Sequence, residues 1–278
     1  MTLPVFFAVL LAALLHAGWN AILKSGGDKI DSMYVMSTAQ GLMGLGLVTI
    51  SPLPSGAVWG WIIASVILHT FYKIFLAGAY GHGDLSRVYP IARGAPPMMV
   101  ALFGAVILAD SVSPSQYGGI FLVGLGILAM ARGVFTGGES LRLLPFALGS
   151  ALMTAGYTVV DGLGARVATS TAAYVAWMFF LDGVLFASWA VTIRGKPVLR
   201  YTARLWVQGL LAGAASYAAY AIVVRAMTQA PIALVAALRE TSVLFAVLIG
   251  VLFFRERASP GKLVAAGLIL SGVVLTRL

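Results

Sequence analysis

The second half of the chain repeats landmarks of the first half at one constant spacing. Six landmarks recur 146 positions later without a gap: Arg93 as Arg239, Gly104 as Gly250, Asp110 as Glu256, Ser113 and Pro114 as Ser259 and Pro260, and Gly126 as Gly272. An internal repeat restricts the fold to architectures that are built from two similar units. We therefore predict two repeats, residues 1–139 and residues 140–278.

The composition places both repeats in a membrane. Hydrophobic residues make up 60% of the chain, charged residues only 10%, and the mean hydropathy is +0.98. A membrane-spanning helix needs about 20 apolar residues. Ten segments meet this need: 3–23, 32–52, 58–80, 86–109, 115–131, 143–165, 171–193, 205–226, 230–254 and 260–277. We predict an all-α membrane protein with ten transmembrane helices, the first of them retained rather than cleaved as a signal peptide.

The number of segments and the charges in the loops predict an orientation. Five segments per repeat is an odd number, so the second repeat enters the membrane from the opposite side and the two repeats have inverted topology. Loops after odd-numbered segments hold eleven Lys and Arg residues, against three on the other side. Basic loops stay in the cytoplasm, so we expect both termini on the outer side of a bacterial inner membrane. The basic loops account for the net charge of +9 without a nucleic-acid partner.

Several polar and ionisable residues fall inside the predicted spans, where a central charge costs about 2.5–3.5 kcal/mol and faces the bundle interior or a wet cavity. On four segments the polar residues recur at helical spacing and share one face. The candidate substrate-binding residues are His16, Trp19, Asn20, His69, Tyr72, Lys73, Tyr157, Tyr217 and Tyr220. Asp161 and Glu240 are candidates for binding a proton or an ammonium group.

The two repeated arginines complete the predicted site. Arg93 and Arg239 each lie about 10–14 Å deep on helices that enter from opposite sides. Pro90, Pro96 and Pro97 surround Arg93 and predict a break in that helix, which would expose backbone groups beside a cavity.

Each of these residues also has a structural interpretation. The arginines can bind helix ends or extend toward the nearer interface, and the histidines can link helices. Adjacent residues point about 100° apart on a helix, so we expect Arg239 and Glu240 not to neutralise each other; Lys73 is an alternative partner for Glu240. Asp182 is expected to pair with a buried cation. Asp110 and Glu256 are expected to cap the helices that begin at the two Ser-Pro pairs, where a Ser N-cap is followed by Pro in the first turn.

Two stretches resemble a known family. Residues 254–260, with Glu256, Ser259 and Pro260 followed by Gly267 and Gly272, resemble the end of an EamA-type repeat of the drug/metabolite transporter superfamily. Residues 15–20 resemble the first helix of many members. The resemblance covers essentially the whole chain. It implies a secondary transporter without ATP or a bound cofactor, and a central cavity lined mainly by the first, third, fourth, sixth, eighth and ninth helices. Many relatives keep both termini in the cytoplasm, whereas the loop charges here predict both outside.

The leading hypothesis is a permease for a small polar metabolite, an organic anion or a zwitterion such as an amino acid or aminophosphonate. The alternatives are an exporter of lipophilic cations that uses Glu240 and a flippase for an anionic lipid. The sequence holds no HExxH, GxSxG or P-loop motif, which argues against an enzyme. The three histidines lack metal-ligand spacing, and the chain has no cysteine. Ten helices suffice to enclose a cavity in a monomer; a dimer through glycine-rich faces is the alternative.

Overall fold

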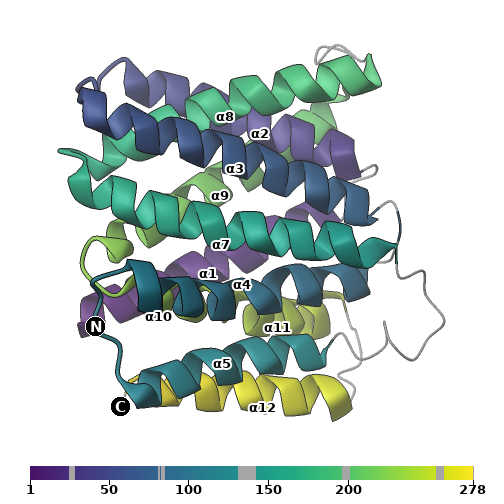
Figure 1. The fold of residues 1–278 in the computed structure, drawn as a ribbon. Coiled ribbons are helices and arrows are strands. Elements are labelled where there is room, and N and C mark those ends of the chain that lie inside the picture. The colour runs from purple at the N-terminus through teal and green to yellow at the C-terminus, as the bar shows by residue number, and fades with distance from the viewer. Residues whose placement is uncertain are drawn as a thin grey trace.

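Helices form all the regular structure in the part of the chain that the computed structural model describes, which is residues 1–24, 29–80, 82, 85–130, 142–195, 201–254 and 260–277. Figure 1 shows them running roughly side by side, with both termini at the same end. Their bounds are α1 Leu3–Lys24, α2 Lys29–Val48, α3 Gly56–Tyr80, α4 Leu85–Ile107, α5 Pro114–Ala129, α7 Leu143–Val167, α8 Thr171–Arg194, α9 Ala203–Met227, α10 Ile232–Arg239, α11 Ser242–Phe254 and α12 Pro260–Leu275. The predicted all-helical fold class is confirmed.

The described residues contain seven stretches that are long and apolar enough to cross a membrane. They lie on α1, α3, α4, α7, α8, α9 and the combined length of α10 and α11. The helices α5 and α12 are apolar but shorter, with 16 residues each. Large apolar side chains cover the outside; Val106 is 87% exposed and Phe253 78% exposed. A surface of this kind suits lipid rather than water.

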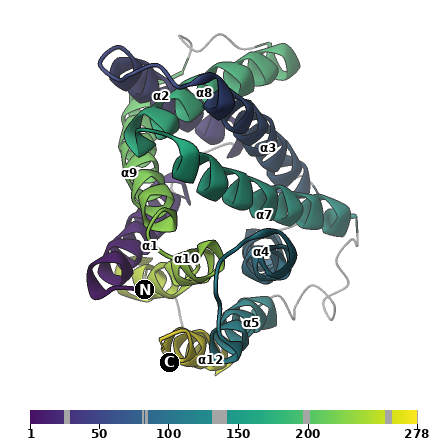
Figure 2. The same cartoon turned by 60° about the vertical axis from the view of Figure 1, so that its left-hand side comes forward.

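The helices of the two halves pair with each other rather than forming two separate bundles. The most extensive contacts between helices join α1 with α9, α2 with α8, α3 with α7 and α5 with α12. Figure 2 shows α2 and α8 at one side of the molecule and α5 and α12 at the opposite side. The space between these pairs is bordered by helices from both halves, and it contains the cavity that is the candidate functional site.

The contact between α2 and α8 depends on glycines. A Cβ atom on Gly183 would lie 2.7 Å from the Cα of Gly41 and 2.9 Å from the carbonyl oxygen of Ser37. Both atoms belong to backbone and have little freedom to move. The absence of a side chain at Gly183 therefore sets the distance between these helices. Gly209 and Gly213 also allow close packing, where α9 meets Val35 and Ala39 of α2.

We expect Gly183→Ala to destabilise the protein by about 1–3 kcal/mol, because overpacking forces the two helices apart. The apparent melting temperature in detergent measures the effect. Gly46→Ala on α2 is the matched control, because its Cβ would meet nothing within 4 Å. Equal melting temperatures for the two variants would contradict this account of the α2–α8 contact.

One predicted helix cap is confirmed and another is wrong. Ser113 caps α5 with Pro114 at its first position and Gln116 closing a capping box. Asp110 does not cap this helix; its Oδ2 instead accepts a hydrogen bond from the backbone N–H of Ile232, at the start of α10. The segment between α4 and α5 thus places the Asp110 carboxylate against the start of α10, in the second half of the chain. Glu256 and Ser259 lie outside the described residues.

The predicted break in the helix that carries Arg93 is absent, and a different helix is broken instead. Pro90, Pro96 and Pro97 are all inside the continuous helix α4, which packs against α5, α7 and α10. Packing of this kind lets a helix tolerate prolines. The break falls between α10 and α11, where Glu240 and Thr241 donate backbone hydrogen bonds to the third residue before them. The Thr241 hydroxyl donates a second hydrogen bond to the carbonyl oxygen of Leu238, at 2.7 Å.

Candidate functional site

A cavity lies at the centre of the helices and draws residues from both halves of the chain. Its walls come from α1, α2, α3, α4, α7, α8, α9 and α10, and it holds about 130 Å³ of solvent-accessible volume. One water molecule needs on the order of 10–15 Å³ by this measure. The cavity therefore has room for several waters or a small metabolite.

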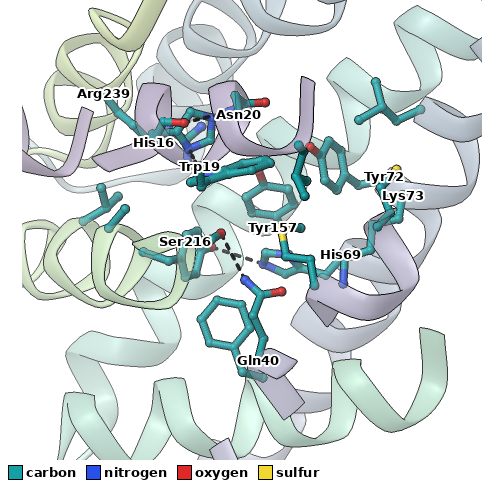
Figure 3. Close-up of a pocket in the computed structure, with 18 of the residues that line it drawn as sticks. His16, Trp19, Asn20, Gln40, His69, Tyr72, Lys73, Tyr157, Ser216 and Arg239 are labelled. Carbon is teal, nitrogen blue, oxygen red and sulfur yellow. Dashed lines mark hydrogen bonds between the residues drawn. The ribbon is translucent and has the colours of Figure 1, made fainter. Parts of the chain in front are cut away.

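Most of the predicted site residues meet in this cavity, and Figure 3 shows several of them. The predicted residues on its wall are His16, Trp19, Asn20, His69, Tyr72, Lys73, Arg93, Tyr157, Tyr220 and Arg239. Three others are absent from the wall. The ring of Tyr217 packs 4.8 Å from that of Phe179, and Asp161 and Glu240 are fully buried behind the wall.

Two arginines share one carboxylate beside the cavity. The Oε1 atom of Glu240 lies 3.1 Å from Nη2 of Arg239 and 3.6 Å from Nη1 of Arg93. All three side chains are buried, with residue exposures of 4% or less. Together they carry one net positive charge next to the cavity. We call these three residues the arginine cluster.

The expectation that Arg239 and Glu240 do not pair is wrong. It assumed a continuous helix, but α10 ends at Arg239 and Glu240 is its C-cap residue. The changed backbone direction brings the two side chains together. The repeated arginines, which approach from opposite halves of the chain, therefore converge on the carboxylate at the helix break.

His16 lies next to the arginine cluster through its Nδ1 atom. Its Nδ1 accepts a hydrogen bond from Nε1 of Trp19 at 3.3 Å, and Nη2 of Arg93 lies 3.5 Å from the same atom. Both neighbours can only donate, so Nδ1 carries the lone pair and Nε2 carries the proton. Nε2 is buried and has no partner among the described residues. His16, a residue of the cavity wall, thus keeps an N–H donor that no described residue accepts from.

Lys73 has its own counter-ion on the opposite wall. Its Nζ lies 2.5 Å from Oδ2 of Asp182 and donates to the hydroxyl of Ser37 at 2.9 Å. The expected pairing of Asp182 with a buried cation is confirmed, and Glu240 is not the partner of Lys73. Because Lys73 is neutralised locally, the net positive charge on the cavity wall belongs to the arginine cluster.

Asp161 is the centre of a hydrogen-bonded network behind the wall. Tyr174 donates to its Oδ1 at 2.8 Å, Tyr220 donates to its Oδ2, and Nε2 of His69 lies 3.1 Å from Oδ2. The ring of His69 also stacks on Tyr157 at 3.9 Å between centroids. The network fixes His69, Tyr157 and Tyr220 as an aromatic side of the cavity.

The chain is similar to known proteins in the sequence of its second half and in its fold. Residues 142–278 match the model of the EamA-like transporter family. This match assigns the second half of the chain to the EamA-like transporter family. A crystal structure of another protein resembles the whole chain, with a TM-score of 0.78 at 17% sequence identity, over 99% of this chain and 98% of that one. Similarity at this identity concerns the fold alone. None of the curated proteins matches the chain.

Membrane-type helices and the match to this family identify the protein as a membrane transporter. Among the described residues, no group of three or more His, Asp or Glu side chains is arranged to hold a metal ion. The side chains on the wall are suited to binding a charged or polar molecule through hydrogen bonds and aromatic contacts.

The cavity of the transporter extends toward one end of the molecule. Its wall includes Leu23 near the end of α1, Ser32 near the start of α2 and Leu76 near the end of α3. At the other end, Val5, Val9 and Met227 belong to a buried apolar cluster. The termini lie at this second end (Figure 1).

A polar clamp reinforces the closed end. Arg166 on α7 makes a two-pronged ion pair with Asp110, at 2.8 and 3.1 Å. The same guanidinium donates to the carbonyl oxygens of Met227 and Ala230, where α9 leads into α10. Asp110 and Arg166 thus tie the region between α4 and α5, the end of α7 and the start of α10 together.

Sequence reasoning missed several wall residues, including Gln40 on α2 and Phe179 on α8. Both helices fall outside the set that the family resemblance implied. Gln40 is a polar amide in the middle of an apolar segment, and that property could have identified it. Ser216 is four residues before Tyr220 and shares its helix face, but it was not among the predicted site residues.

Proposed function

We propose that this protein is a secondary transporter for a small polar metabolite with an anionic group, either an organic anion or a zwitterion such as an amino acid or aminophosphonate. The arginine cluster is the observation that carries the proposal, because two buried guanidiniums share one carboxylate at a cavity wall. A bound carboxylate, phosphonate or sulfonate would neutralise the remaining charge. Guanidinium groups bind such anions through paired, charge-assisted hydrogen bonds.

Aromatic side chains would hold the rest of the solute. Trp19, Tyr72, Tyr157 and Tyr220 lie on the cavity wall, and the rings of Tyr72 and Tyr157 meet edge to face at 5.7 Å. Flat rings bury apolar surface and restrict the orientation of a small ligand. A solute with an anionic end and a compact body matches this arrangement.

We further propose that the chain forms ten transmembrane helices in two inverted repeats. Under this relation α1 corresponds to α7 and α3 corresponds to α9. The pairing of α1 with α9 then maps onto the pairing of α7 with α3, while the pairs α2–α8 and α5–α12 map onto themselves. This pattern supports repeats at residues 1–139 and 140–278. Inverted repeats typically place the binding site between them.

The two ends of the cavity differ, because the cavity extends toward one end and a buried apolar cluster fills the other. We expect transport by alternating access between this state and the opposite one. With both termini outside, the end that includes Leu23 and Ser32 faces the cytoplasm, and the clamp of Asp110 and Arg166 closes the outer end. Transport would require this clamp to open while the cytoplasmic end closes. We expect the protein to do so in a bacterial inner membrane.

Arg166→Gln is expected to open the outer end more often, because it removes the ion pair with Asp110. The chain has no cysteine, so single introduced cysteines report access without background. A cysteine introduced at Val9, in the buried apolar cluster of the closed end, should react with a thiol reagent about tenfold faster in the Arg166→Gln background. A tenfold change corresponds to a loss of ~1.4 kcal/mol in the stability of the closed state. A cysteine at Met36, on the cavity wall, is the control. An unchanged rate at Val9 would contradict the role of the clamp.

Thermal stabilisation of the purified protein by a panel of solutes tests the proposed function. The panel contains amino acids, organic acids, phosphonates, phosphorylated metabolites, lipophilic cations and anionic lipids. A ligand at a hundredfold excess over its Kd adds about 2.7 kcal/mol of apparent stability. Stabilisation by anions or zwitterions supports the proposal. Stabilisation by lipophilic cations alone, or by anionic lipids alone, would contradict it in favour of a drug exporter or a flippase.

The cation-exporter alternative has a particular difficulty. It needs Glu240 to face an incoming cation, but Glu240 is fully buried behind the wall and pairs with Arg93 and Arg239. A cation that approached it would also approach two guanidiniums. Positive charges that lie close together repel strongly in a medium of low dielectric constant.

A further inference from the structure

We propose that Gln40 and Ser216 form a second polar subsite, which accepts hydrogen bonds from an ammonium group of the solute. The inference deepens the proposed function and rests on it. It restricts the solute from any small anion to a zwitterion, with its anionic group at the arginine cluster and its ammonium group at Gln40.

Gln40 and Ser216 join helices from the two halves at the cavity wall. Nε2 of Gln40 on α2 donates to the hydroxyl oxygen of Ser216 on α9 at 3.0 Å, and both residues line the cavity. The hydrogen bond uses one side of the amide and fixes its orientation. The other side, the Oε1 atom, is then an acceptor held in a defined place.

The Oε1 atom has no partner in the part of the chain that the structure describes, although Gln40 is only 3% exposed. Buried side-chain oxygens almost always have a hydrogen-bond partner, and each exception calls for an explanation. In a transporter cavity, a donor supplied by the solute is such an explanation.

The subsite and the arginine cluster lie on different sides of the cavity. In Figure 3, Arg239 and His16 lie on one side, Gln40 and Ser216 on another, and the rings of Trp19 and Tyr157 lie between them. A solute that reaches both places needs two polar ends and a body that contacts these rings. Zwitterions have this form.

The surroundings of Gln40 favour a cationic donor over a neutral one. Lys73, a cation on the same cavity wall, is neutralised by Asp182 and also donates a hydrogen bond to the Ser37 hydroxyl. The rings of Phe179 and Tyr220, whose centroids are 5.6 Å apart, add aromatic surface to the wall. Aromatic faces attract ammonium groups, and an amide oxygen accepts from them without a proton transfer.

Matched pairs of probes that differ only in the amine test the inference. The pairs are taurine with ethanesulfonate, 2-aminoethylphosphonate with ethylphosphonate, and L-phenylalanine with 3-phenylpropionate. Thermal stabilisation curves give the Kd of each probe for the wild-type protein, Gln40→Met, Ser216→Ala and the control Met36→Leu, which also lines the cavity on α2.

In the wild-type protein, the amine-bearing probe of at least one pair is expected to bind about tenfold more tightly, or better, than its partner. Gln40→Met is expected to reduce this ratio toward one while leaving the Kd of the amine-free probe within a few fold. Ser216→Ala should reduce it in part and serves as the second variant if Gln40→Met does not fold. Met36→Leu should keep the wild-type ratio.

Two results would overturn the inference while the proposed function stands. Amine-bearing and amine-free probes could bind equally to the wild-type protein, or the preference for the amine could survive in both Gln40→Met and Ser216→Ala. Binding of no anion or zwitterion at all would instead overturn the proposed function, and this inference with it.

Discussion

Arg239→Gln is expected to reduce strongly the thermal stabilisation that anionic or zwitterionic solutes give to the wild-type protein. In this variant Glu240 still pairs with Arg93, so the charges of the two remaining residues cancel. The cavity wall would lose both its net positive charge and one guanidinium donor. We expect the Kd of a bound anion to rise about 10- to 100-fold, as for the loss of a hydrogen bond between charged groups.

Two variants control this measurement. Arg239→Lys keeps the charge but not the planar donor pair, and should lose part of the affinity. Arg225→Gln removes an exposed arginine from the last turn of α9 and should have no effect on the Kd. The assignment of the anion site would be refuted by an Arg239→Gln protein that folds normally and binds the same anion with unchanged affinity.

Glu240→Gln is expected to destabilise the protein more than the other substitutions considered above. Glu240 is fully buried and faces two guanidiniums, so the change leaves two buried positive charges close together. Breaking a buried ion pair costs about 3–5 kcal/mol. For a chain of this size the apparent melting temperature should fall by roughly 10 °C.

A double substitution separates charge balance from loss of one side chain. In Glu240→Gln combined with Arg239→Gln, only Arg93 of the arginine cluster keeps its charge, and we expect the melting temperature to recover in part. The coupling between the two changes should exceed about 1 kcal/mol, because the residues are in direct contact. Wild-type stability of Glu240→Gln would show that the carboxylate is not the counter-ion of the arginines.

The sequence predicted the fold class and the course of most helices because apolar segments of membrane length are distinctive. Charge and helical spacing also identified most of the polar and aromatic residues that line the cavity. His16 and Trp19 on one segment and His69 and Tyr72 on another were recognised because each set shares a helix face. The structure brings these faces together on the cavity wall.

Other features depend on tertiary packing and could not be read from local pattern. The break after Arg239 contains neither proline nor glycine, whereas the prolines of α4 are accommodated by neighbouring helices. The pairing of Arg239 with Glu240 follows from that break. Asp110 crosses to α10 because the two halves interlock. Gln40 was missed because the prediction gave weight to charged and aromatic residues, although a polar amide in a largely apolar segment is itself a signal.

Exchange of a labelled solute across proteoliposomes tests the central claim most directly. Vesicles that contain the purified protein are loaded with the solute that stabilises it most strongly in the panel, and entry of the radiolabelled form is followed against an opposing unlabelled pool. The account predicts saturable exchange by the wild-type protein, normal exchange by Arg225→Gln and little or none by Arg239→Gln. Exchange that is equal in wild-type, Arg239→Gln and protein-free vesicles would contradict it.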